Sequence, residues 1–394
     1  MASWHTLPTE LHLQIVECLE EKEARTFSAV NLQAYRVCVP LLFRHVHLQH
    51  LDSFVNNVPR AYYRHIHTLE LHVNGHIDAL STLLTATPCL TTLVLHLNGS
   101  IEHDIIPAFL HARALRSLTI RNVSPEVLAP LSERLVVSIA ASVPELHHLH
   151  LERISRSVLH APELVGKHPF VPLVAGDSDI PHHPTLGASL NLPSLLSIPS
   201  LKQLTIHDTH LGDPMWTTTP VLCNLQMLDL GSCAHEPSAP NRLAIERIMS
   251  AVGPSLSAFS LPTALEAPPP LPRLRSLHIS PFVPPDQVVD TVAALAESPI
   301  EALSVQCFAE DVADACGALE AFLALRCSRG PSFFGKLSRI DVAISGELDA
   351  LDPAHDKAAE RLMDFCRNIH LTSFVPRKRR TSAGDRLRSN SCAF

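Results

Sequence analysis

One spacing of apolar residues, Leu-x-x-Leu-x-Leu with Ile, Val or Phe allowed, recurs ten times along the chain. The ten copies are Ile66-Leu69-Leu71, Leu90-Leu93-Leu95, Leu115-Leu118-Ile120, Leu146-Leu149-Leu151, Leu201-Leu204-Ile206, Leu225-Leu228-Leu230, Leu256-Phe259-Leu261, Leu274-Leu277-Ile279, Ile300-Leu303-Val305 and Leu337-Ile340-Val342. In the last three positions of each copy, the repeated apolar residues alternate with other residues, which is the periodicity of a half-buried strand. Repetition at a fixed internal spacing predicts a stack of similar units.

Segments with the helical spacing of apolar residues separate these copies. In residues 287–297, Val288, Val292 and Leu295 fall at i, i+4 and i+7. The other such segments are 77–86, 101–113, 127–143, 243–252, 312–325 and 358–369. Alternating strands and helices with short links give parallel strands, and stacked units bury their apolar faces against each other. The sequence therefore predicts an α/β solenoid, with a compact doubly wound α/β domain as the alternative.

The pattern resembles leucine-rich repeats from about Ile66 to Val342. In that family the repeat continues to an Asn or Cys whose side chain bonds the backbone of the following turn. Asn74, Asn98 and Cys233 occupy this place. Four other copies carry a different residue there: Ile154, Ala264, Phe282 and Phe308. The resemblance thus implies an irregular array.

Two parts of the chain lack the repeat pattern after it has begun. Residues 152–200 are rich in Pro and Gly, and we interpret them as an inserted loop with much disorder, with room for one degenerate repeat near 192–198. Residues 376–394 carry six basic residues against one acid and are expected to form a disordered basic tail. The predicted domains are a helical unit at 1–48, the solenoid at 49–375 and this tail.

The first 48 residues show three short helical patterns in place of the repeat. Leu11, Ile15 and Leu19 lie at i, i+4 and i+8 in the first of them. Three helices of this size bury little and would leave apolar surface for a partner. The alternative is that they only cover the end of the solenoid, as terminal repeats require.

This segment resembles an F-box, and more narrowly the fungal form that leads into irregular leucine-rich repeats. The resemblance is carried by Leu7-Pro8-x-Glu10-Leu11, Ile15, Leu19, Phe27-Ser28-x-Val30-Asn31 and Pro40-Leu41-Leu42-Phe43. The usual Trp of the third helix is absent, with Tyr35 in its region. The resemblance implies docking on a Skp-type adaptor and, through it, a cullin of a ubiquitin ligase. The docking residues it implies are Leu7, Pro8, Leu11, Ile15, Leu19, Val30 and Leu32.

Residues between the repeated Leu positions are expected to face away from the buried side of the sheet. Because neighbouring strands lie about 4.8 Å apart, equivalent residues would form ladders. The first ladder is Glu70, Val94, Thr119, His150, Thr205, Asp229, Ser260, His278, Ser304 and Asp341, and the second is His72, His96, Arg121, Glu152, His207 and Gly231. The candidate substrate-binding residues are Glu70, His72, His96, Thr119, Arg121, His150, Thr205, His207, Asp229 and His278. His72 and His96 are candidates for a pH response, although two solvated histidines are the simpler interpretation.

Composition and missing motifs narrow the function classes. The net charge of −8 argues against a nucleic-acid binder. No apolar run is long enough to predict a membrane span. The ten Cys form no CxxC pair, so neither a disulfide framework nor a metal site is expected. A chain of this kind is expected in a reducing compartment, the cytoplasm or the nucleus. No phosphate-binding or hydrolase motif is found, so no catalytic residue or cofactor is expected. We expect a non-enzymatic adaptor that is monomeric by itself; the alternatives are a repeat scaffold without a ligase role and an α/β enzyme.

Overall fold

The computed structural model describes residues 7–345 apart from 74–76, 127, 163–172, 175–176, 232–237, 266–267, 270, 309–310 and 331. The helix expected at 358–369 and the basic tail lie outside the described residues. Asn74 and Cys233, two of the expected turn residues, lie outside them as well.

Eleven of the thirteen strands in the described residues form one parallel sheet whose order follows the sequence, and β6 (Arg156–Ser157) and β7 (Leu173–Val174) form a separate two-stranded sheet. The members of the larger sheet are β1 (His45–Leu48), β2 (Thr68–Val73), β3 (Thr92–Leu97), β4 (Ser117–Asn122), β5 (His148–Glu152), β8 (Gln203–His207), β9 (Met227–Leu230), β10 (Ala258–Leu261), β11 (Ser276–Ile279), β12 (Ala302–Phe308) and β13 (Arg339–Ser345). All ten predicted strands are present. A sheet in chain order excludes the doubly wound alternative, in which the order of the strands reverses at a switch point.

Strand β1 was missed by the sequence analysis. It pairs in parallel with β2, placing Val46 beside Leu69 and Leu48 beside Leu71. The spacing Phe43-x-x-Val46-x-Leu48 fits the repeat pattern, but this stretch was assigned to the helical unit on its resemblance to an F-box. The sheet therefore begins at His45, before the predicted boundary at residue 48.

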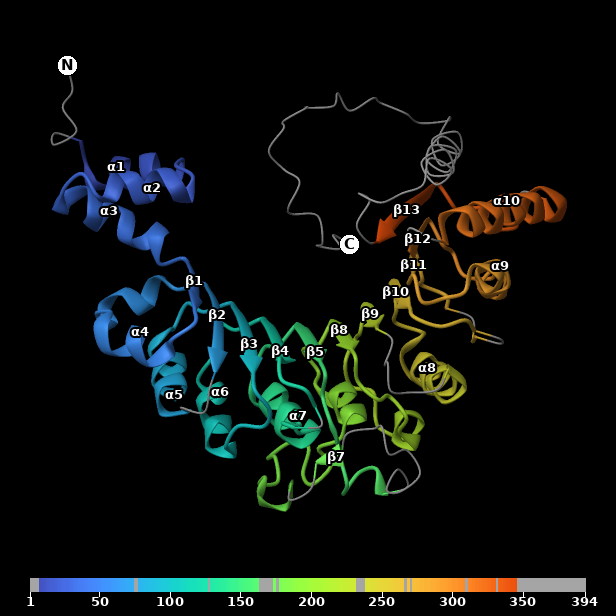
Figure 1. The fold of residues 1–394 in the computed structure, drawn as a ribbon, viewed down its shortest axis with the longest axis horizontal. Helices are drawn as coiled ribbons and strands as arrows, with labels where there is room; N and C mark the ends of the chain where they lie inside the picture. The colour runs from blue at the N-terminus through green and yellow to red at the C-terminus, as the bar shows by residue number, and fades with distance from the viewer. Residues whose placement is uncertain are drawn as a thin grey trace.

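Helical segments return the chain from one strand to the next. They are α4 (Leu51–Asn57), η2 (Arg60–His65), α5 (Ile77–Ala86), η3 (His103–Ile105), α6 (Ile106–Leu110), α7 (Glu133–Ser142), η5 (Asp177–Asp179), η6 (Leu192–Ser197), η7 (Pro214–Thr217), α8 (Ser238–Val252), α9 (Pro285–Ala294) and α10 (Val312–Arg329). The chain bends into an arc with the strands along its inner side and the helices along its outer side (Figure 1). The described helices therefore cover the outer face of the sheet and leave its inner face uncovered (Figure 1).

The repeated apolar positions make up the core between these two layers. The three residues of every copy from Ile66 to Ile279 are at most 2% exposed. Burial of a Leu or Ile side chain contributes about 1.5–3 kcal/mol, so each unit is stabilised largely by its contacts with its neighbours. In the last described strand Val342 is only partly buried.

Three helices precede the sheet: α1 (Thr9–Glu17), α2 (Glu21–Ser28) and α3 (Leu32–Leu42). They have a small core of their own around Val16, Val37 and Cys38, separate from the core of the sheet. The side chain of Asn31 accepts a hydrogen bond from the Ala34 amide at 2.8 Å and so caps α3. The ring of Tyr62, in η2, lies 5.1 Å from that of Phe43, which ties this unit to the solenoid.

The interpretation of residues 152–200 as a largely disordered loop is wrong for the residues described. Leu190, Leu192, Leu195 and Leu196 are fully buried, and β6 (Arg156–Ser157) pairs with β7 (Leu173–Val174). The stretch near 192–198 forms η6 on the outer side, not an additional repeat, because β5 pairs directly with β8. Pro and Gly content predicted an irregular path here but could not reveal how well the path is packed.

Candidate interaction surface

The inner face carries both predicted ladders in register. Glu70, Val94, Thr119, His150, Thr205 and Asp229 lie opposite one another on successive strands, and Ser260, His278, Ser304 and Asp341 continue the row. His72, His96, Arg121, Glu152 and His207 are paired in the same way. One surface thus brings together residues spread over more than 250 positions of the sequence.

At the amino-terminal end of this face, Glu70 lies between two histidines. Its Oε1 is 3.0 Å from His96 Nε2, and its Oε2 is 3.3 Å from His47 Nδ1. Burial would raise the pKa of Glu70, but its hydrogen bonds to His96 and His47 lower it overall. The His72 ring stacks on that of His96 at 4.4 Å, and the pKa of His72 is lowered by burial and then by the two neighbouring histidines. His47 is a member of the surface that the sequence analysis missed, because β1 was missed.

An ion pair occupies the middle of the face. Arg121 Nε lies 3.1 Å from Glu152 Oε2, and Thr119 is half-buried beside it on β4. On the next strand, burial and the nearby His207 and Arg121 lower the pKa of His150 to about 4. This part of the face therefore holds a fixed charge pair and an imidazole that is neutral near pH 7.

His207 and Asp229 form the next pair, with Nε2 and Oδ2 3.3 Å apart. Burial would lower the pKa of His207, but the hydrogen bond to Asp229 and the nearby carboxylates raise it overall. A Cβ atom at Gly231 would lie 2.6 Å from the ring of His207, so only Gly leaves room for this arrangement. The second ladder accordingly has no side chain at Gly231, directly after β9.

Two of the candidate substrate-binding residues are not available to a partner. Thr205 and His278 are each only 8% exposed. Neighbouring side chains cover them; His278 Nδ1, for example, lies 3.1 Å from Ser304 Oγ. Equivalent residues of neighbouring strands lie close together on the inner side of the arc and can cover one another. The repeat pattern predicts which residues face inward but not which of them a neighbouring side chain covers. The other eight candidates are half-buried, and among them the side chains of Glu70, Arg121 and His207 are 41%, 40% and 37% exposed.

A separate apolar surface lies on the N-terminal unit. Leu11 and Ile15 are 42% and 43% exposed, and Val30 and Leu32 are 67% and 63% exposed. Leu11 and Ile15 share one side of α1, while Leu13 lies on the opposite side and lines a hollow against α3 and η2. Four of the seven predicted docking residues are therefore large apolar side chains left open to solvent.

The other three predicted docking residues differ in their surroundings. Pro8 is exposed and Leu7 is half-buried. Leu19, in contrast, packs against the small core of the unit together with Phe27. The i, i+8 spacing predicted one stripe through Leu11, Ile15 and Leu19, but α1 ends at Glu17, so Leu19 lies beyond it and turns inward.

The asparagine expected at the turn is found at a different position. Asn98 is exposed, whereas Asn122 is 1% exposed and accepts a hydrogen bond from the Gly99 amide at 3.1 Å. Its side-chain amide also donates to the Ala129 carbonyl at 2.9 Å. Asn122 thus bonds the backbone of two turns, the one after β3 and the one after its own strand β4, in the manner expected of the family residue.

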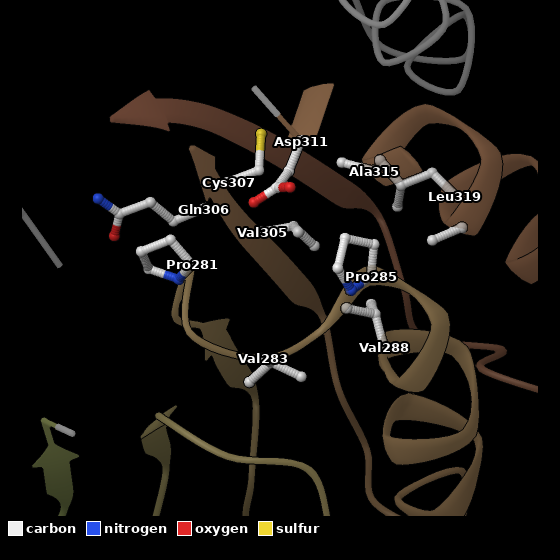
Figure 2. Close-up of a pocket in the computed structure, with 11 residues that line it drawn as sticks. Pro281, Val283, Pro285, Val288, Val305, Gln306, Cys307, Asp311, Ala315 and Leu319 are labelled. Atoms are coloured by element: carbon white, nitrogen blue, oxygen red, sulfur yellow. The ribbon is translucent and has the colours of Figure 1, made fainter. Parts of the chain in front are cut away.

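A pocket near the carboxyl end of β12 is too small for a ligand. Pro281, Pro285 and Val288 close it from one side, with Cys307 and Asp311 at its edge (Figure 2). Its volume of about 10 Å³ holds roughly one water molecule, whereas small-molecule sites span about 300–1,000 Å³. Burial, Asp311 and Cys316 raise the pKa of the Cys307 thiol to about 11, so it is not a ready nucleophile.

The described residues hold neither a metal-binding cluster nor a helix that could cross a membrane. Nowhere in this part of the chain do three or more His, Cys, Asp or Glu side chains gather so that they could hold a metal ion. No described helix is both long and apolar enough to span a membrane.

Comparisons with known proteins find likeness only among solved structures. No family model matches the sequence, and no curated protein matches it. An internalin (InlF) from Listeria monocytogenes is 13% identical over 75% of this chain and 88% of its own, with a TM-score of 0.27. The TLR13–ssRNA13 complex is matched at 13% identity over 67% of this chain and 41% of the TLR13 chain, with a TM-score of 0.24.

The fold is a leucine-rich-repeat solenoid. This follows from the chain itself, because ten copies of one apolar spacing form successive strands of a single parallel sheet, and nine of them bury all three apolar positions. The copies differ in length and in their helical segments, so the array is irregular, as the sequence analysis expected.

Proposed function

We propose that this protein is the substrate-recognition adaptor of a Skp-cullin-F-box type ubiquitin ligase. The observation that carries the proposal is a three-helix unit with its own core, placed ahead of a repeat solenoid, that leaves Leu11, Ile15, Val30 and Leu32 open to solvent. Large apolar side chains that remain exposed in a small unit usually mark a site for a protein partner. The resemblance of the same residues to an F-box supports a Skp-type adaptor as that partner.

The mechanism is positioning, without a chemical step on this chain. Leu11 and Ile15 enter a groove of the adaptor and lose contact with water, which makes them the centre of the interface. The inner face of the solenoid binds a protein substrate through its polar ladder. Both contacts made by one chain raise the effective concentration of the substrate at the ubiquitin-transferring machinery.

The test measures binding of the full chain to a purified Skp-type adaptor. Ile15→Asp is expected to weaken binding at least tenfold, because it places a charge in the apolar interface. Leu128→Asp is the matched control, since Leu128 is 81% exposed on the solenoid and outside the proposed interface. Equal binding by the wild type and Ile15→Asp would contradict the proposal.

The second candidate is a repeat scaffold with no ligase role, and the open ladder on the inner face favours it equally. The two differ in one measurement. If the wild type does not bind a Skp-type adaptor, while Arg121→Glu on the inner face weakens binding to a protein partner, the chain is a scaffold of this second kind.

A further inference from the structure

A third row of residues runs along the edge of the sheet where the strands begin. Each member after the first directly follows the first apolar residue of a repeat and donates its backbone N–H to the carbonyl of the member before it, at 2.7–3.0 Å. In chain order the row reads Arg44, His67, Thr91, Arg116, His147, Lys202, Gln226, Ser257, Arg275, Glu301 and Ser338. These backbone bonds fix the order and closeness of side chains that lie far apart in the sequence.

The two halves of this row differ in charge. From Arg44 to Lys202 it carries three cationic side chains, two histidines and no carboxylate. In the second half, Arg275 is neutralised by its neighbour Glu301 at 2.6 Å. The charge in the first half is therefore a local feature of a chain whose net charge is −8.

The cations gather most closely on β4, β5 and β8. Here Arg116, His147 and Lys202 are neighbours in the row, His148 lies beside Ser117 and Gln203, and Arg113 is exposed just before β4. We call Arg113, Arg116, His147, His148 and Lys202 the basic rim. Their neighbour Glu145 offsets part of the charge, with its Oε2 3.7 Å from Arg116 Nη2 in an exposed pair that salt and water screen.

The two histidines of the basic rim have lowered pKa values, mainly because of burial and also because basic groups lie beside them. Burial and then Lys202 and Arg116 lower the pKa of His147, with Glu145 opposing them. Burial and then His147 and Lys202 lower the pKa of His148. Both rings are thus neutral near pH 7 and able to take up a proton when an anion arrives.

We propose that the basic rim binds an acidic segment of a protein partner, a short run of Asp and Glu residues. Three neighbouring strands span about 10 Å, which an extended chain covers in about three residues. The groups on the basic rim and beside it donate hydrogen bonds: guanidinium, ammonium, imidazole, hydroxyl and amide. Such a surface satisfies several carboxylates at once.

A protein segment fits this surface better than a nucleic acid does. A strip about 10 Å long faces only two or three phosphates, and the overall charge of the chain repels a long polyanion. A short acidic run meets only the local charge, because the field beyond about 8 Å is screened at physiological salt. The basic rim does not include the apolar residues of α1 that are proposed to bind the Skp-type protein. It would therefore give this chain a second, separate site for a protein partner.

The test uses a fluorescein-labelled peptide with six consecutive Glu residues and its six-Gln counterpart, and reads fluorescence anisotropy with the full chain. Wild type is expected to bind only the Glu peptide. Affinity should increase about threefold to tenfold from pH 7.5 to 6.0, because His147 and His148 gain protons beside the anion. The variant Arg116→Glu/Lys202→Glu is expected to bind the Glu peptide at least tenfold more weakly than the wild type does. Arg275→Glu is the matched control, because it reverses a charge of the same row away from the basic rim, and it should bind as wild type does.

Three outcomes would overturn the inference. They are equal binding of the Gln peptide, an equal loss in Arg275→Glu, and stronger binding of a poly(U) RNA of six nucleotides than of the Glu peptide. The Skp-adaptor assay with Ile15→Asp does not involve these residues. Failure of the basic rim and failure of the proposed function are therefore observed separately.

Discussion

Arg156 is a fully buried cation in the segment between β5 and β8. Its Nε lies 2.9 Å from Glu133 Oε2, and its Nη2 lies 2.7 Å from Asp213 Oδ2. It also donates to the carbonyl of Gly212 at 2.7 Å. The three charged groups come from α7, β6 and the loop before η7, so together they attach this segment to the solenoid.

Replacing this arginine should be among the most damaging single changes to the segment. Arg156→Met leaves Glu133 and Asp213 buried without their cation, and we expect a loss of about 3–5 kcal/mol in the free energy of unfolding. Urea denaturation measures it. The triple variant Arg156→Met/Glu133→Gln/Asp213→Asn carries no buried charge and should recover part of the loss. A single variant as stable as wild type would contradict this account.

His150 makes stability depend on pH. Its pKa is lowered to about 4 in the folded chain, against about 6.5 when unfolded. Between these values the unfolded chain binds the additional proton, so the stability that neutral His150 contributes is present above pH 6.5 and is lost as pH falls toward 4. His150→Gln should flatten the change in unfolding free energy between pH 7 and 5 by roughly 1–2 kcal/mol.

Denaturant titrations at pH 7, 6 and 5 measure this slope, that is, how steeply the free energy of unfolding changes with pH. His148→Gln is the matched control, because His148 precedes it by two residues on the same strand and is exposed. It should change the slope less. If His150→Gln leaves the slope as steep as in wild type, burial of the neutral ring is not the cause.

The regular elements were predictable because apolar spacing alone decides them. Leu118 on β4 and Leu204 on β8 stand at the same place in their copies, and both are fully buried. The segment 77–86 was predicted as a helix and is α5. Where a strand or helix buries one face, periodicity carries the necessary information.

The irregular elements were not predictable in the same way. In residues 152–200 the path depends on contacts between distant positions, such as Arg156 with Asp213. Arg134 likewise reaches the Ala188 carbonyl at 3.3 Å. Buried charges of this kind look like solvated charges in a sequence, because only the fold brings their partners near.

The candidate surfaces were predicted in part for the same reason. Register follows from the repeat, so the two inner ladders were correct as rows, while the burial of Thr205 and His278 depends on neighbouring side chains. Three members of the basic rim, Arg116, His147 and Lys202, stand in the sequence directly after the first Leu of a repeat. The positive charge of this part of the row is therefore visible in the sequence at one fixed position of the repeat.

Two separate cores imply that the molecule unfolds in two parts. Val16, Val37 and Cys38 form the core of α1–α3, while a continuous core runs along the sheet. In a solenoid each unit is stabilised by its neighbours, so a defect spreads along the array but need not cross a weak junction. The junction here is the contact of Tyr62 with Tyr35 and Phe43.

Hydrogen exchange can test this division. Val16→Asp places a charge in the small core and should speed amide exchange throughout α1–α3 while leaving β3–β9 protected as in wild type. Leu204→Ala opens a cavity between β5 and β9, costs about 3–5 kcal/mol, and should speed exchange in the neighbouring strands but not in α1–α3. Faster exchange across the whole chain in either variant would show one cooperative unit. A change at the proposed adaptor contact would then also disturb the inner face that is proposed to bind the substrate.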